Sequence, residues 1–154
     1  MKKGIDCVGI FVTGICYDGK GNILYRRRGL GARDEQGKWD PGVGGALELG
    51  ETLEQCLLRE MKEEISTTPT NFEFLGHMEK FRSLSAIETH WLGFYFKCLI
   101  DSNTVVIDDN QECDAIAWAP FHMHQSPMMI GFEDTYTKFK NILVKMERRP
   151  RFTN

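Results

Sequence analysis

The stretch GALELGETLEQCLLREMKEEIS, residues 45–66, begins with glycine and carries six glutamates, three of them within five consecutive positions. Its middle repeats apolar residues at the spacing of one helix face, so it predicts an amphipathic helix from Thr52 to Ile65. Thr52 and Gln55 have the spacing of a capping box, which places the helix start at Thr52. These residues therefore combine a well-signalled helix with an unusual density of negative charge.

Three of the glutamates are predicted to share one face of this helix. Each residue advances about 100° around the helix axis, so Glu60 and Glu64 lie one turn apart, with Glu63 within about 60° of Glu60. Their face adjoins the apolar arc and lies roughly opposite Lys62. Same-sign pairs at this spacing destabilise a helix by about 0.2–0.5 kcal/mol each. Either the carboxylates spread into solvent as an ordinary acidic surface, or a cation gathers them.

The residues around these glutamates resemble the Nudix box, the signature of the Nudix hydrolase family. The pattern is G-x5-E-x7-R-E-U-x-E-E, where U is a bulky apolar residue, here Met61. Its fixed positions are filled by Gly45, Glu51, Arg59, Glu60, Glu63 and Glu64. A chance match of six fixed positions in a chain of this size has a probability on the order of 10⁻⁵. The box spans residues 45–67.

The end of the box departs from the family pattern. The family closes it with glycine and an apolar residue, whereas this chain has Ser66 and Thr67. Glycine suits a left-handed turn at a helix end, and serine there costs about 1 kcal/mol. The departure affects the loop after the helix and leaves the charged residues unchanged.

The resemblance implies the fold and the reaction. The implied fold class is α/β, a Nudix-type α/β/α sandwich with a mixed β-sheet between helices, and the whole chain, residues 1–154, is expected to be one domain. The implied activity is Mg²⁺-dependent hydrolysis of a diphosphate linkage in a nucleoside diphosphate derivative, with Mn²⁺ as a substitute ion. The substrate remains open among nucleoside triphosphates, oxidised nucleotides, nucleotide sugars and dinucleoside polyphosphates.

The resemblance also assigns roles within the box. The implied metal ligands are the carboxylates of Glu51, Glu60, Glu63 and Glu64 and the backbone carbonyl of Gly45. Arg59 is expected to pair with a carboxylate and orient it. A bound divalent ion neutralises the diphosphate and lowers the pKa of a bound water, whose proton a carboxylate then accepts.

Four residues outside the box are further candidates. Arg26 and Arg28 face the same side of a predicted strand and suit a forked contact with the substrate diphosphate; the alternative is a solvated strand end. Trp39 has a ring that suits stacking on a base, although core packing accounts for it equally well. Glu112 lies where some Nudix enzymes supply a base or an extra metal ligand, and its alternative is an ordinary loop acid.

Apolar runs and turn signals predict the remaining elements. The glycine-rich residues 29–45 are expected to form a loop. A second helix is expected at Glu133–Arg149, with Tyr136, Phe139, Leu143 and Met146 on its apolar side. The expected strands are residues 7–17, 23–27, 71–77, 90–100 and 112–118.

Composition narrows the class of protein. The 154 residues are 42% hydrophobic and carry a net charge of −3, which disfavours a nucleic-acid binder. No apolar stretch approaches the length of a membrane span. Five cysteines without a C-x-x-C pair predict neither a disulfide framework nor a zinc ribbon, so we expect a cytoplasmic protein. A homodimer stays open, because many Nudix proteins dimerise.

Two other functions remain open at the level of sequence. One is a non-catalytic Nudix module that senses a nucleotide, whose usual mark is the loss of box glutamates. The other is an isomerase of an allylic diphosphate, which needs a cysteine and a tyrosine or glutamate facing each other over the metal. The small-molecule nucleotide substrate of a hydrolase is the interpretation that the intact box favours.

Overall fold

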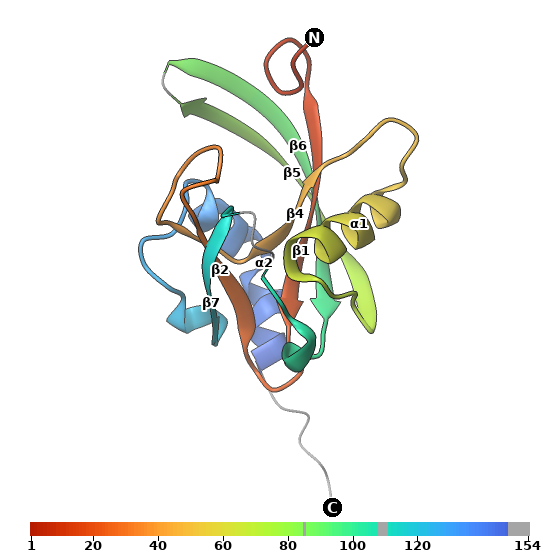
Figure 1. Ribbon diagram of the computed structural model, residues 1–154, viewed down its shortest axis with the longest axis vertical. Coiled ribbons are helices and arrows are strands. Elements are labelled where there is room, and N and C mark those ends of the chain that lie inside the picture. The colour runs from red at the N-terminus through yellow and green to blue at the C-terminus, as the bar shows by residue number, and fades with distance from the viewer. Residues whose placement is uncertain (85, 108–110, 148–154) are drawn as a thin grey trace, which may run out of the picture.

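The computed structural model describes residues 1–84, 86–107 and 111–147. Within them, seven strands form one mixed sheet with two α-helices and two short 3₁₀ helices (Figure 1). The path of the sheet is β3-β2-β1-β6-β5, with β4 paired to β1 and β7 paired to β2. In chain order the elements are β1 (Gly9–Tyr17), β2 (Ile23–Arg28), β3 (Trp39–Asp40), β4 (Gly42–Ala46), α1 (Leu53–Ile65), β5 (Asn71–Leu84), β6 (Ile87–Leu99), η1 (Ser102–Thr104), β7 (Cys113–Ala119), η2 (Phe121–Met123) and α2 (Phe132–Glu147).

Strand β1 organises the sheet. It pairs in parallel with β6 along its full length, from Gly9 opposite Trp91 to Tyr17 opposite Leu99. It also pairs antiparallel with β2 at one end and with β4 through its middle. The glutamate helix follows β4 in the chain and packs against it, so β1 indirectly positions that helix.

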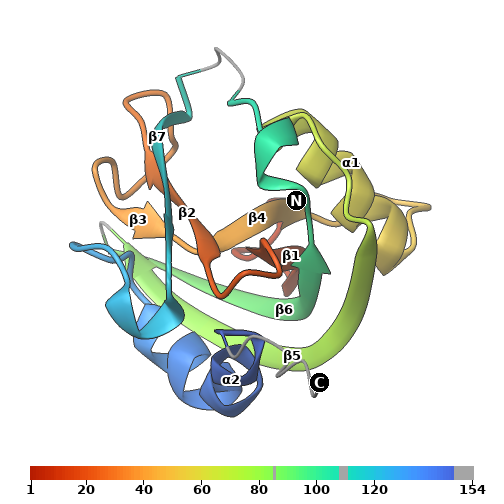
Figure 2. The same ribbon diagram turned by 90° about the horizontal axis from the view of Figure 1, so that it is seen from below.

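The two faces of β1 belong to two different cores. Val12 and Cys16 join the cluster beneath α1, which includes Leu57 and Met61, whereas Ile15 joins the cluster beneath α2, which includes Phe139. Successive side chains of a strand point to opposite faces, so α1 and α2 cover opposite sides of the sheet, as Figure 2 shows. The expected arrangement of a mixed sheet between helices is therefore confirmed.

The prediction that residues 29–45 form a loop is wrong at its C-terminal end. β3 lies at Trp39–Asp40, and β4 begins at Gly42. Glycine-rich sequence disfavours strands, but β4 pairs with β1 from Gly42 opposite Ile15 to Ala46 opposite Phe11. This pairing is a tertiary contact that local sequence preference does not signal.

The strand expected at residues 71–77 is also longer than predicted. β5 continues to Leu84 and pairs with β6 from Asn71 opposite Leu99 to Leu84 opposite Ile87. The register shifts between Phe74 and Gly76, which interrupts the two-residue period. The strand nevertheless continues past this irregularity, because its pairing with β6 is maintained to Leu84.

The ends of the two α-helices agree closely with expectation. Thr52 caps α1, which ends at Ser66 in the left-handed region, with φ 56°. The chain thus keeps the turn that glycine usually supplies and places serine there. α2 begins at Phe132, one residue before the predicted start, and its predicted last residues, 148 and 149, lie outside the described residues, as does the side chain of Met146.

Neither α-helix of the described chain combines the length and the apolar character that crossing a lipid bilayer requires.

Candidate active site

The first turn of α1 is fixed by reciprocal hydrogen bonds. Gln55 N donates to Thr52 Oγ1 at 3.1 Å, and Thr52 N donates to the Gln55 side-chain oxygen at 2.9 Å. This capping box satisfies two backbone donors that a helix start would otherwise leave free. It also fixes where the following turns present their glutamates.

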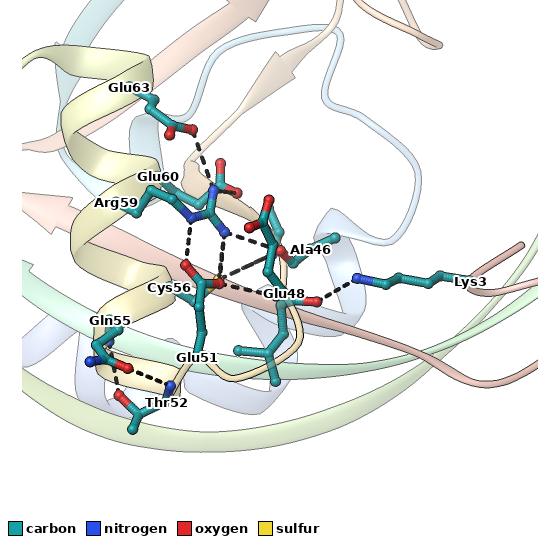
Figure 3. Close-up of polar contacts among 12 residues, drawn as sticks. Lys3, Ala46, Glu48, Glu51, Thr52, Gln55, Cys56, Arg59, Glu60 and Glu63 are labelled. Atoms are coloured by element: carbon teal, nitrogen blue, oxygen red, sulfur yellow. Dashed lines mark hydrogen bonds and ion pairs between the residues drawn. The ribbon is translucent and has the colours of Figure 1, made fainter.

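Arg59 lies at the centre of three of the predicted metal ligands (Figure 3). Its Nε donates to Glu51 Oε1 at 2.6 Å, and its Nη1 donates to Glu60 Oε1 at 2.7 Å. Nη1 also lies 3.3 Å from Glu63 Oε2. A further bond from Nη2 to the carbonyl oxygen of Ala46, at 3.3 Å, ties the guanidinium to β4. Arg59 therefore pairs with carboxylates as expected, and with three of them.

The surroundings shift the pKa values of the carboxylates in different directions. Hydrogen bonding from Arg59 lowers the pKa of Glu51 to about 2. Burial raises the pKa of Glu60, and Arg59 offsets only part of that effect. Glu63 is exposed. The Arg59 guanidinium thus binds two carboxylates that are largely buried and one that is exposed.

Glu64 has a separate set of partners. Arg26 Nη2 lies 3.0 Å from Glu64 Oε2, and the backbone N–H of Gly44 donates to the same oxygen at 2.8 Å. Burial nevertheless raises the pKa of Glu64 to about 7, because the ion pair with Arg26 compensates the lost hydration only in part. The pKa of Glu64 is thus shifted in the opposite direction from that of Glu51.

Two adjacent glycines bring β4 close to its neighbours. A Cβ atom added at Gly44 would come closer than 3.0 Å to backbone atoms of Val12 and Thr13, and one at Gly45 would come equally close to the Glu60 carboxylate. Gly44 therefore lets β4 approach β1, and Gly45 leaves room for the side chain of Glu60. The glycines before the helix therefore allow close contacts that any larger residue would prevent.

The donor set fits a hard divalent cation in composition. Glu51, Glu60, Glu63 and Glu64 present only oxygen donors, and these four carboxyl groups outnumber the two guanidinium groups of Arg26 and Arg59. No three His, Cys, Asp or Glu side chains in the described parts of the chain form a ready-made metal cluster. The guanidinium of Arg59 lies where the carboxylates converge, and the carbonyl oxygen of Gly45 lies 3.9 Å from Cys56 Sγ.

Two pockets adjoin this cluster. The first has a volume of about 320 Å³ and reaches Gly44 and Gly45, whereas the second has about 200 Å³ and is lined by Glu64. Asp40 and Arg33 line both pockets. Glu64 therefore borders the smaller pocket, and the larger pocket reaches the two glycines beside Glu60 and Glu64.

The other predicted site residues have diverse positions. Arg26 and Arg28 line the smaller pocket, but Arg26 also bonds Gly42 O and Arg28 pairs with Asp34 at 2.8 Å. Glu112 is exposed and lines the same pocket. Trp39 packs against the core beneath α2, with the Arg27 guanidinium 5.8 Å from its ring centre, and neither pocket includes it.

Sequence reasoning missed the residues of the larger pocket that lie on β5 and β6. Lys80 and Arg82 line it from β5, and Trp91 and Tyr95 line it from β6. The alternation of Lys80, Phe81 and Arg82 was the available signal. Lys80 and Arg82 lie beyond residue 77, where the predicted strand ends, so the sequence did not place their side chains on a common strand face.

Known protein sequences resemble this chain over most of its length. The sequence model of the NUDIX domain matches residues 9–138. An "Isopentenyl-diphosphate Delta-isomerase" of Leifsonia xyli is 28% identical over 106 residues, which cover 67% of this chain and 57% of that protein. An "8-oxo-dGTP diphosphatase" of Escherichia coli is 44% identical over 36 residues, which cover 23% of this chain and 28% of that protein. The chain thus spans less than two thirds of the length of either relative.

The fold also has close counterparts among solved structures. A MutT NUDIX hydrolase from Burkholderia pseudomallei superposes with a TM-score of 0.72 at 16% sequence identity. The match covers 93% of this chain and all of that one. This similarity concerns the arrangement of helices and strands.

Proposed function

The chain belongs to the NUDIX domain family, whose match covers residues 9–138, and from this premise we propose a Mg²⁺-dependent hydrolase. Its substrate is a nucleoside diphosphate derivative, and the bond that it cleaves lies in the diphosphate linkage. Mn²⁺ is expected to replace Mg²⁺. The observation that carries the proposal is the cluster of four box carboxylates around only two guanidinium groups, with Glu64 at the edge of a pocket.

The side chains have distinct roles in this proposal. Glu51, Glu60, Glu63 and Glu64 hold the cation, which when bound neutralises the diphosphate and lowers the pKa of a water. Arg59 orients Glu51 and Glu60 through the bonds of 2.6 and 2.7 Å described above. A carboxylate of this set accepts the proton of the attacking water.

Two residues of β2 and Glu112, which directly precedes β7, complete the site beside Glu64. Arg26 fixes the Glu64 carboxylate and therefore acts as a positioning residue. Arg28 is partly exposed in the smaller pocket, where its positive charge favours a phosphate oxygen. Glu112 borders this pocket and is the candidate for an additional proton acceptor.

The comparisons and the cysteines support the rest of the proposal. The bacterial relative named for 8-oxo-dGTP favours a nucleotide as the substrate. All five cysteines are free, four of them buried, which suits a reducing cytoplasm. Trp39 remains a candidate for substrate contact only if the bound molecule extends beyond both pockets.

Metal dependence gives the direct test of this function. Purified protein should release phosphate or a nucleoside monophosphate from at least one compound in a panel of nucleoside triphosphates, oxidised nucleotides, ADP-ribose and dinucleoside polyphosphates. Excess chelator should abolish release, and Mg²⁺ should restore it. Hydrolysis that continues at full rate in chelator would contradict the proposed chemistry.

An isomerase of an allylic diphosphate is a second candidate. The relative named isopentenyl-diphosphate Delta-isomerase favours it, and Cys113 lines the smaller pocket together with Glu112. However, Cys113 Sγ donates to the carbonyl oxygen of Ala115 at 3.3 Å, and burial raises the pKa of this thiol. An isomerase would interconvert isopentenyl diphosphate and dimethylallyl diphosphate, which NMR detects, without releasing phosphate.

The same panel separates the sensing alternative from both enzymes. A non-catalytic module would bind a nucleotide, measured by calorimetry, and leave it intact after prolonged incubation with Mg²⁺. The presence of every charged residue of the box favours turnover over this outcome.

A further inference from the structure

The larger pocket has a floor of flat aromatic rings. Phe11 on β1 faces Gly93 on β6, and Trp91 on β6 faces Gly9 on β1. A Cβ atom at either glycine would come closer than 3.0 Å to the ring opposite it. The two glycines therefore allow Phe11 and Trp91 to lie against the sheet, with their ring centres 6.4 Å apart.

One wall of this pocket is positively charged. Lys80 and Arg82 occupy alternate positions of β5, so both side chains point to the same face, and both line the pocket. Lys80 is paired across the strands with Trp91, so the two side chains lie next to each other on this face. Arg33, which is largely exposed, adds a third cation at the lining.

Local acceptors satisfy the charge of Lys80 only in part. Its Nζ donates to the carbonyl oxygen of Gly131 at 2.9 Å and to Thr135 Oγ1 at 3.2 Å, which are neutral groups. Among the described residues it forms an ion pair with Asp134, at 3.9 Å, and this carboxylate is 74% exposed. Solvent weakens so long a contact, and only 13% of the Lys80 side chain is itself exposed.

Arg82 shares its counterion with other groups. It pairs with Glu35, which also lies 3.2 Å from Lys38 Nζ and accepts a bond of 2.7 Å from the backbone N–H of Ile130. Within the described residues, the Nε of Arg82 is buried and has no hydrogen-bond acceptor. A buried donor without an acceptor is costly, so the contacts of the described residues leave Arg82 only partly satisfied.

The two cations also act on each other. Burial lowers the pKa of Lys80, and the positive charge of Arg82 lowers it further, although Asp134 raises it. The remaining acid of the lining is Asp40, whose pKa burial raises and which already accepts a bond from the backbone N–H of Gly42. The wall thus carries positive charge that the described neighbours do not fully balance.

We propose that this wall binds an additional phosphate of the substrate, one that lies apart from the scissile diphosphate. The inference rests on the proposed function, because the same pocket reaches Gly44 and Gly45 beside the carboxylate cluster. A molecule with its diphosphate at the glutamates can extend over the aromatic floor and place a second anionic group against Lys80 and Arg82. The pocket volume of about 320 Å³ suits such a fragment.

The proposed substrates are therefore only a part of the nucleoside diphosphate derivatives that the family reaction can cleave. They are nucleoside diphosphate derivatives with more phosphate than the cleaved linkage contains. The extra phosphate has two sources with the same chemistry, a phosphate ester on a sugar or a longer phosphate chain. Charge-assisted bonds to a lysine and an arginine recognise both.

Matched pairs of compounds test the inference. ADP-ribose 2′-phosphate is compared with ADP-ribose, and diadenosine tetraphosphate with diadenosine diphosphate, by kcat/KM with Mg²⁺ and by calorimetric binding without it. Wild-type protein should favour the member with more phosphate in at least one pair by about tenfold, the size of one charge-assisted contact. Which pair shows the preference identifies the source of the phosphate.

Two variants then assign the preference to the wall. Lys80→Gln and Arg82→Gln should each remove most of it, whereas Lys20→Gln, the same charge change in an exposed turn, should preserve it. Thermal melting identifies any variant that fails to fold, and the other variant then decides. A preference that survives both changes, or no preference in either pair, overturns the inference.

The two proposals fail in different ways. Tighter binding of the compound with more phosphate, lost in the two variants but without hydrolysis of any compound, supports this inference and contradicts the proposed function. Equal hydrolysis of both members of each pair, unchanged in the variants, supports the proposed function and contradicts this inference.

Discussion

Replacement of Glu64 by Gln is expected to lower kcat by about 10²- to 10⁴-fold while the fold persists. Glu64 lies on α1 with its carboxylate held by Arg26 and by the N–H of Gly44, at the edge of the smaller pocket. Glutamine keeps the size of the side chain and an acceptor for Gly44, but it removes the charge that we assign to cation binding. Steady-state kinetics with saturating Mg²⁺ give the measurement.

Glu54→Gln is the matched control for this prediction. Glu54 lies in the first turn of the same helix and is exposed. Its replacement changes the same charge at a position outside the cluster, so kcat should stay within about twofold of the wild type. Near-normal turnover of Glu64→Gln, in protein whose melting curve shows a folded state, would refute the role of Glu64.

Alanine substitutions at the two adjacent glycines of β4 should affect different properties, stability at Gly44 and activity at Gly45. Gly44→Ala forces a Cβ into backbone atoms of Val12 and Thr13, which cannot move without breaking the pairing of β1 with β4. We expect it to lower the free energy of unfolding by about 3 kcal/mol or more, because paired backbone atoms cannot move aside to relieve the steric overlap. Urea denaturation followed by circular dichroism measures this loss.

Gly45→Ala serves as the comparison at the next residue. There the added Cβ meets the carboxylate of Glu60, the end of a side chain that can rotate away. The fold should be nearly unchanged, and kcat should fall by about tenfold or more as Glu60 leaves its place. Equal losses of stability in the two variants would contradict this division between fold and site.

Local signals in the sequence predicted the glutamate helix well. The capping box of Thr52 and Gln55 and the apolar spacing of Leu57, Met61 and Ile65 fixed its position, because each signal acts within one or two turns. All three apolar residues are fully buried. The family was likewise identified from side chains that lie close together in the chain.

The side-chain contacts of the site that the sequence did not predict join residues far apart in the chain. Arg59 was expected to meet one carboxylate, but its reach to Glu51, eight residues earlier, depends on the turn that brings β4 back to α1. The bond between Arg26 and Glu64 joins residues 38 positions apart, because Arg26 of β2 also bonds Gly42 of β4 and α1 packs against β4. No periodicity within a segment encodes such pairings.

The position of β1 between strands from distant parts of the chain has a consequence for the order of events during synthesis. Its longest ladder, with β6, is complete only when Leu99 pairs with Tyr17. The apolar segment from Gly9 to Tyr17 must therefore leave the ribosome long before its principal partner exists, and such non-local pairing slows folding. Until β6 has emerged, the apolar segment lacks this partner, and an unpaired apolar strand is prone to aggregation.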